Sequence, residues 1–153
     1  MDRLETNDIQ HFLLARTPAL AARYEFLTFR NPAAACTWLS GLVDKVGTAD
    51  SVGSNSPDSR WVTLAFTWNG LRALGLDEAS LASFPDEFKQ GLAARAKILG
   101  ITGANHPDQW LGNLADPELH AIAILFARDV PERERCRKEH ARYLDQIDGV
   151  EVL

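Results

Sequence analysis

The chain is poor in cysteine and has no long apolar run. Its two cysteines, Cys36 and Cys136, lie 100 positions apart, a spacing that matches no metal-binding or redox motif. Reduced thiols are therefore expected, as in a cytoplasmic protein. The first residues are acidic and polar and lack the basic and apolar regions of an export signal. Since no apolar run approaches the roughly 18 residues of a membrane span, we expect a cytoplasmic protein without membrane contact.

An excess of basic charge is also missing. The 16 basic residues are spread along the chain among 21 acidic ones, and the net charge is −5. This distribution offers no footprint for nucleic acid, so no nucleic-acid partner is expected. The 153 residues, 46% apolar and 24% charged, are ordinary for one soluble domain with a real core.

Familiar catalytic and metal-binding motifs are absent. The sequence holds no G-x-S-x-G nucleophile motif and no glycine-rich phosphate loop. The four histidines are His11, His106, His120 and His140. None lies in an H-x-x-x-H, H-E-x-x-H or Cys/His cluster, so we expect surface or packing histidines, with His140 partly buried. Cys36 is expected to be a structural thiol on a helix. The sequence therefore assigns no catalytic, cofactor-binding or metal-binding residue.

Four segments have the composition of β-strands, and two helical patterns separate them. The predicted strands are residues 24–30, 61–68, 119–130 and 150–153. The predicted helices are 32–46, which Asn31 and Pro32 would open, and a charged helix at 131–147. This order predicts the α+β class, with a ferredoxin-like antiparallel sheet of the dimeric α/β-barrel type, covered by helices. We expect an N-terminal segment at 1–23 and the domain at 24–153.

An insertion of about 50 residues, at about 69–118, separates the second strand from the third. A short turn would suffice in a plain small domain. The insertion has helical patterns at 71–76, 78–84 and 87–99, followed by a loop rich in glycine and proline. Residues 47–60, by contrast, are expected to form a mobile loop between the first helix and the second strand.

Both faces of the predicted strands are apolar. In the second strand, Val62 and Leu64 point one way, while Trp61 and Ala65 point the other. The third strand behaves in the same manner. A half-solvated antiparallel sheet should alternate to polar residues. The second face is therefore expected to pack on another sheet, another domain or a second copy of the chain.

Five stretches, in order, carry a family resemblance. They are Asn7-Asp8-Ile9-Gln10, residues 31–35, residues 64–75, the run Phe84-Pro85 through Arg95, and residues 99–110 with Pro107 and Trp110. These stretches resemble parts of the dye-decolourising (Dyp-type) haem peroxidases. In the same order, the family's counterparts are the motif D-I-Q-G, the first strand and helix, and the motifs N-x-A-F-T-x-x-G-L-x-A-L-G, F-P-x-E-F-x-x-G-M-x-x-R and L-G-D-x-G…P…W. His11, Leu92 and Ile101 depart from the glycine, methionine and acid of those motifs. The chain thus resembles the N-terminal half of such an enzyme.

The resemblance implies a protein of two ferredoxin-like halves packed through their sheets. The second half holds haem through a proximal histidine, and a G-x-x-D-G motif supplies a distal acid that an arginine assists. Such enzymes use hydrogen peroxide to oxidise dyes and phenolic compounds. An acid beside a cation suits peroxide cleavage, because a proton must move between the two oxygens while charge develops on the departing one.

This chain contains no G-x-x-D-G. Its nearest string, at 145–149, begins with Asp145 rather than glycine and lies at a predicted turn. We therefore expect that the chain alone lacks haem and activity, and that Phe84, Pro85, Phe88 and Gly91 are scaffold or cleft-edge positions. The partner through the sheet face is expected to be a second copy or a missing C-terminal domain. Whether the chain is a truncated piece or a natural short protein stays open, as does whether it is an enzyme.

Two other functions stay open. The first is a small homodimeric α/β-barrel enzyme, such as a cofactor-free monooxygenase. A polar cluster inside a well-formed pocket would favour it, and the long insertion argues against it. The second is a non-catalytic module that binds a partner through its sheet.

Overall fold

The computed structural model describes residues 4–14, 19–51 and 60–153, and its centre is a four-stranded antiparallel sheet. The strands are β1 (Ala21–Phe29), β2 (Arg60–Phe66), β3 (Ala121–Ala127) and β4 (Val150–Val152). Their order across the sheet is β2-β3-β1-β4, and every neighbouring pair is antiparallel. This topology confirms the predicted α+β, ferredoxin-like class.

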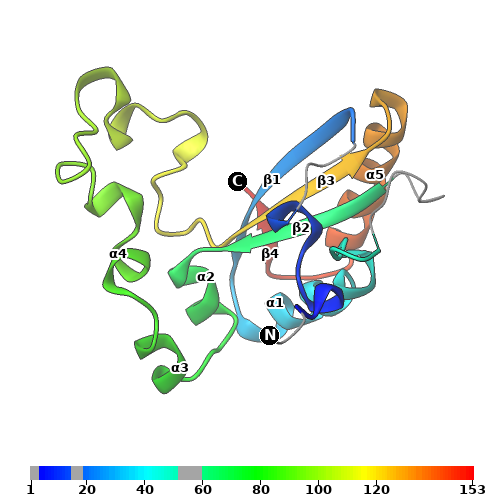
Figure 1. Cartoon of the computed structure of the whole chain (residues 1–153), viewed down its shortest axis with the longest axis horizontal. Coiled ribbons are helices and arrows are strands. Elements are labelled where there is room, and N and C mark those ends of the chain that lie inside the picture. Colours follow the sequence, from blue (N-terminus) through cyan, green and yellow to red (C-terminus); the bar gives the residue numbers. More distant parts are fainter. Residues whose placement is uncertain (1–3, 15–18, 52–59) are drawn as a thin grey trace.

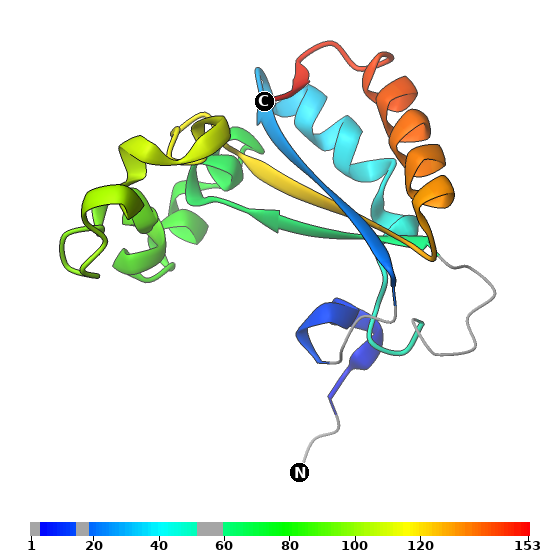
Figure 2. The same cartoon turned by 90° about the horizontal axis from the view of Figure 1, so that it is seen from above.

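Two helices, α1 (Pro32–Ser40) and α5 (Val130–Leu144), cover one face of the sheet (Figure 2). Each begins with the same local chemistry. The Asn31 side chain accepts a hydrogen bond from the Ala34 N–H, and the Asp129 side chain accepts one from the Glu132 N–H, with proline in the first turn of each helix. No helix in the described part of the chain is long and apolar enough to cross a membrane.

The core lies between these helices and the sheet. Trp38 of α1 is fully buried, and its ring lies 5.4 Å from that of Phe29 on β1. Leu27, Leu64 and Leu125 pack in the same cluster from three different strands. Burial of each such side chain contributes about 1.5–3 kcal/mol, so this layer carries the stability of the fold.

Helix α1 ends six residues before the predicted limit of Val46, and the prediction was wrong there. The hydroxyl of Tyr143 on α5 donates to the Thr37 carbonyl at 2.6 Å, and the Trp38 carbonyl lies 3.2 Å away. A carbonyl of the last turn thus finds a partner outside the helix. Gly41 follows, where a Cβ atom would lie 2.1 Å from the same hydroxyl. The chain continues into a short 3-10 turn, η3 (Val43–Lys45).

The insertion forms a helical lobe beyond one end of the sheet (Figure 1). The lobe contains α2 (Trp68–Ala73), α3 (Glu78–Ala82), α4 (Asp86–Ala94) and the 3-10 turns η4 (Gly103–Asn105), η5 (Pro107–Gln109) and η6 (Leu111–Asn113). Its position between β2 and β3 confirms the predicted helical insertion.

Several boundaries differ from the predictions because a cap or a glycine intervenes. Strand β2 stops at Phe66, since the Thr67 side chain accepts the Gly70 N–H and starts α2. Strand β3 stops at Ala127, since Asp129 caps α5. The single helix predicted for 87–99 is wrong. Gly91, at φ 71° and ψ 174°, interrupts α4, which ends at Ala94.

The N-terminal segment lies along the free edge of β2 and includes the turns η1 (Thr6–Asp8) and η2 (His11–Leu13). The Gln10 side chain donates from Nε2 to the Leu64 carbonyl at 2.9 Å and accepts the Leu64 N–H at 2.8 Å. This amide thereby occupies the hydrogen-bonding groups that a neighbouring strand would use. Val46 also bridges to Val62. Strand β1 begins at Ala21, before the predicted Tyr24. Most of the loop predicted at 47–60 lies outside the described residues.

Candidate functional site

The sheet face opposite α1 and α5 carries apolar side chains that no helix of the described residues covers (Figure 2). We call this surface the open face. It consists of Tyr24 and Phe26 on β1, Ala65 on β2, and Ile122, Ile124 and Phe126 on β3. Tyr24 is 57% exposed, Ala65 is exposed and the other four are half-buried. Alternation along β3 is strict, because Ala121, Ala123 and Leu125 are buried in the core.

The register places these side chains in rows across three strands. The rows are Tyr24–Ile124–Thr63 and Phe26–Ile122–Ala65, with Ala22–Phe126–Trp61 at one end. Cross-strand neighbours of this kind lie within contact distance of each other. The apolar side chains of the open face are therefore contiguous across β1 and β3, and on β2 they flank Thr63, whose side chain is buried.

One end of the open face is closed by the N-terminal segment. The Trp61 ring stacks on Phe126 at 5.4 Å, and the His11 ring meets Trp61 edge-on at 6.3 Å. His11 and Trp61 are both buried. Neither the His11 ring nitrogens nor Trp61 Nε1 has a hydrogen-bond partner among the described residues. His11 therefore acts as a packing residue that limits the open face at this end.

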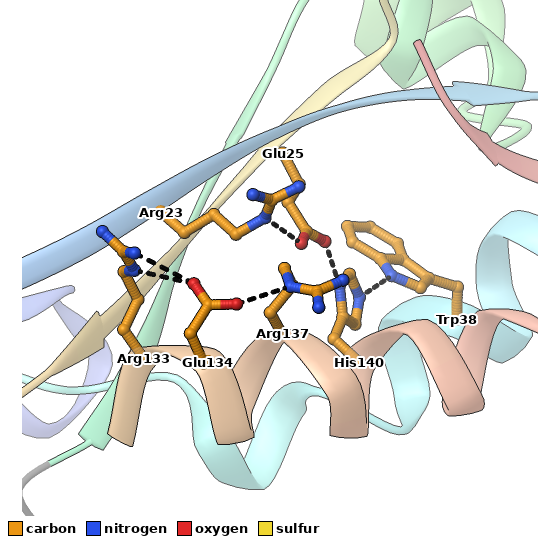
Figure 3. Close-up of polar contacts among 7 residues, drawn as sticks. All are labelled: Arg23, Glu25, Trp38, Arg133, Glu134, Arg137 and His140. Atoms are coloured by element: carbon orange, nitrogen blue, oxygen red, sulfur yellow. Dashed lines mark hydrogen bonds and ion pairs between the residues drawn. The ribbon is translucent and has the colours of Figure 1, made fainter. Parts of the chain in front are cut away.

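A buried polar network lies on the covered side of the sheet (Figure 3). Glu25 of β1 and His140 of α5 each have a side chain only 4% exposed. The Glu25 Oε2 to His140 Nδ1 distance is 2.5 Å, and Trp38 Nε1 donates to His140 Nε2 at 3.0 Å. Because Nε2 accepts, the ring proton belongs on Nδ1, where it is donated to the carboxylate. Both ring nitrogens of His140 are thus occupied.

Glu25 has a second partner at the edge of this network. Arg23 Nε donates to Glu25 Oε1 at 2.7 Å. Burial by itself raises the pKa of Glu25, but hydrogen bonds from His140 and Arg23 outweigh it, so the pKa lies below its ordinary value. On α5, Glu134 forms ion pairs with Arg133 and Arg137 at 2.9 Å each, drawn in the same view (Figure 3).

The remaining histidines and cysteines have ordinary surroundings. His120 Nδ1 accepts the Phe29 N–H at 2.8 Å, and burial lowers the pKa of this ring. His106 is exposed beside Asp108. Cys136 is half-buried, and burial raises the pKa of its thiol. Cys36 lies on α1, as the sequence predicts, and its side chain is exposed.

Three cavities border the fold. The first, of about 400 Å³, lies between β2, η3 and α5 and is bordered by Arg60, Cys136, Glu139 and His140. Arg60 pairs with Glu139 at 2.9 Å. The second, of about 550 Å³, lies between the lobe and the end of the sheet, and Phe88 and Gly91 of the predicted run line it. We call it the lobe cleft. The third, of about 480 Å³, is bordered by Arg72, Glu78, Glu118 and His120.

These residues do not fit a haem. Haem iron needs an axial side chain with a free donor atom facing an apolar slot. His140 borders a cavity, but both of its nitrogens are engaged. His120 borders a cleft shared with Arg72, Glu78 and Glu118, whose charges do not suit a porphyrin face. Within the described ranges, no three His, Cys, Asp or Glu side chains gather as a metal site.

Comparisons with known proteins gave matches among solved structures alone. No family model and no curated protein matches the chain. A fungal DyP-type peroxidase from Auricularia auricula-judae superimposes with a TM-score of 0.81 at 19% identity, covering 100% of this chain and 33% of that chain. A DyP crystal structure gives 0.80 at 17% identity, covering 99% and 32%.

An ancestral D-type dye-decolorizing peroxidase gives a TM-score of 0.75 at 22% identity, covering 90% of this chain and 30% of the other. The chain therefore spans about a third of the length of the peroxidases it matches. At these identities the likeness concerns the fold. The fold of this chain is that of a ferredoxin-like part of DyP-type peroxidases.

Proposed function

We propose that this chain is the N-terminal ferredoxin-like domain of a DyP-type peroxidase-like protein. Its open face receives the sheet of a second ferredoxin-like unit, which holds the haem. Only the assembled protein then carries out hydrogen-peroxide-driven oxidation of dyes and phenolic compounds. In the absence of that unit, a second copy of the chain covers the open face.

The observation that carries the proposal is the open face on a fold shared with these peroxidases. A patch such as Phe26, Ile122 and Ile124 is costly to leave in water, at about 25 cal/mol for each Å² of apolar area. Sheets pack face to face through side chains of this kind, at a spacing of about 10 Å. A second sheet is therefore the partner whose shape fits the surface best.

The surroundings of the histidines also favour a haem ligand in the second unit. His140 is committed to Glu25 and Trp38, and His11 is wedged against Trp61. The proposal therefore assigns the proximal ligand to the other unit and predicts no stable haem binding by this chain alone.

The homodimeric enzyme with an active site in its own pocket has less support. The cavity beside β2 does contain polar residues, as that alternative requires. Its main groups are nevertheless paired with each other, since Arg60 binds Glu139 and His140 binds Glu25. Paired groups of this kind stabilise the fold and have few free hydrogen-bonding atoms with which to bind a substrate.

Haem titration of the purified chain tests the proposal. We expect no stoichiometric Soret band and no peroxide-dependent oxidation of a phenolic substrate by the chain alone. A second ferredoxin-like unit with a proximal histidine and G-x-x-D-G, sought in the same or an adjacent gene, is then co-expressed. That complex is expected to bind haem and to be active.

Ile124→Asp in the chain should abolish assembly with the second unit, because it places a charge at the centre of the open face. Ile98→Asp is the matched control, because Ile98 is 77% exposed on the lobe and away from that face. Stoichiometric haem with turnover in the chain alone would overturn the proposal. So would a complex that forms equally well with Ile124→Asp.

A further inference from the structure

The lobe cleft has the walls of a site for a flat ligand. Four aromatic side chains line it: Phe66, Trp68, Phe88 and Trp110. They come from the end of β2, from α2, from α4 and from the segment between η5 and η6. A volume of about 550 Å³ accommodates a small organic molecule, since such sites usually measure about 300–1,000 Å³.

Most polar groups in these walls are already satisfied within the protein. Thr67 Oγ1 donates to the Leu119 carbonyl at 2.7 Å, and Asn69 Nδ2 donates to the Pro117 carbonyl at 3.1 Å. Trp110 Nε1 donates to the Asn105 carbonyl at 2.9 Å. These groups hold the walls in place and leave few donors for a ligand, so the selectivity of the cleft depends on the remaining groups.

Arg95 is the exception among the arginines. Four arginines of the described residues are half-buried: Arg23, Arg95, Arg133 and Arg137. Arg23 pairs with Glu25, and the two on α5 pair with Glu134. Arg95 lines the lobe cleft and has neither a carboxylate partner nor an aromatic ring beneath its guanidinium among the described residues. A guanidinium in a cleft with no acidic partner among the described residues can pair with the carboxylate of a ligand.

The acids that border the cleft do not neutralise Arg95. Glu87 is exposed at the rim, and Asp116 accepts the Glu118 N–H at 2.8 Å. Neither carboxylate lies within ion-pair distance of Arg95. Lys89, the other basic residue that lines the cleft, pairs with Asp86 at 3.4 Å. The cleft thus combines aromatic walls with one cation, Arg95, that has no acidic partner among the described residues.

We propose that the lobe cleft binds a small aromatic carboxylate, whose ring packs between the aromatic walls while its carboxylate pairs with Arg95. The planar guanidinium presents parallel N–H donors that match both oxygens of a carboxylate. The walls of the cleft come from the lobe and the adjoining end of the sheet, so the site does not depend on haem or on the proposed peroxidase function.

Titration of the full chain with 2-naphthoate, followed by NMR of the backbone amides and tryptophan indoles, tests this site. We expect saturable shifts at Trp68 and Trp110 and small changes on the open face. The neutral analogue 2-naphthamide should bind at least roughly tenfold more weakly, because it lacks the charge that Arg95 pairs with. This acid-against-amide comparison uses the unaltered protein and therefore needs no variant.

Arg95→Gln should weaken 2-naphthoate binding by roughly tenfold or more and leave the weak binding of 2-naphthamide unchanged. Lys97→Gln is the matched control, since Lys97 is exposed in the same lobe and does not line the cleft. Equal affinity for the acid and the amide would overturn the proposal. So would unchanged 2-naphthoate binding in a folded Arg95→Gln variant, or shifts confined to residues outside the lobe.

Discussion

The two faces of the sheet have similar side chains and different surroundings. On one face, Leu27, Leu64 and Leu125 are buried under α1 and α5. On the other, Phe26, Ile122 and Ile124 are only half-buried, and Tyr24 is largely exposed. Both faces have the composition of a core, yet the helices of the described residues cover only one. The proposed function assigns the cover of the other face to a partner.

The covered face also has a buried polar network, in which His140 binds Glu25 and Trp38. Its removal should have the largest effect on the stability of the fold. His140→Ala leaves the buried Glu25 carboxylate without its main partner, which should cost about 3–5 kcal/mol in the free energy of unfolding. Urea denaturation measures this. The exposed His106→Ala should change stability by less than about 0.5 kcal/mol. Equal effects of the two variants would contradict a structural role for the network.

A pair of adjacent residues in β3 compares the two faces directly. Leu125→Ala opens a cavity in the covered core and should cost about 2–5 kcal/mol at any protein concentration. Ile124→Ala on the open face should cost less than about 1 kcal/mol in dilute protein. Its effect should grow with protein concentration, because association stabilises the folded state by mass action. An Ile124→Ala effect that is large and independent of concentration would mean that the face is already covered within the chain.

The hydrogen bonds of Glu25 predict how the covered face responds to acid. A carboxyl group whose pKa is lower in the folded than in the unfolded protein adds stability above its ordinary value of 4.5. That contribution is lost as the pH falls below this value towards the lower, folded-state pKa. The thermal unfolding temperature of the wild type should therefore fall steeply below about pH 4.5. Glu25→Gln should be less stable at pH 7 and should show a shallower decline, and an identical slope would contradict this role.

A last prediction concerns the free edge of β2, where Gln10 binds the backbone of Leu64. Gln10→Ala removes two hydrogen bonds to Leu64, at about 0.5–1.5 kcal/mol each. Stability should fall by about 1–3 kcal/mol, and the Leu64 amide should exchange with solvent faster. Gln109→Ala, an exposed glutamine on the lobe, serves as the control. An unchanged exchange rate of the Leu64 amide would show that the Gln10 side chain does not form these hydrogen bonds in solution.

Local sequence signals predicted the order of elements and several of their starts. Asn31 and Pro32 open α1 where the pattern indicates, and the alternation in β3 predicted two apolar faces. These features depend on neighbours in the chain, so a single sequence contains the information.

The contacts that sequence reasoning missed join distant residues. Tyr143 ends α1 from 106 positions away, and His140 pairs with Glu25 across 115. Glu25 appears in the sequence as one charged residue in an aromatic strand, with no local sign of a buried partner. Arg95 ends a predicted motif, but its lack of a partner emerges only when the lobe is folded. Such features depend on which segments the topology brings together.

Static light scattering of the purified chain across protein concentration tests the central claim most directly, since it measures whether the open face is an interface. We predict a mass above that of the 16.9 kDa monomer, with Ile124→Asp monomeric and Ile98→Asp like the wild type. A wild-type chain that stays monomeric at every concentration, or an Ile124→Asp variant that associates like the wild type, would contradict it.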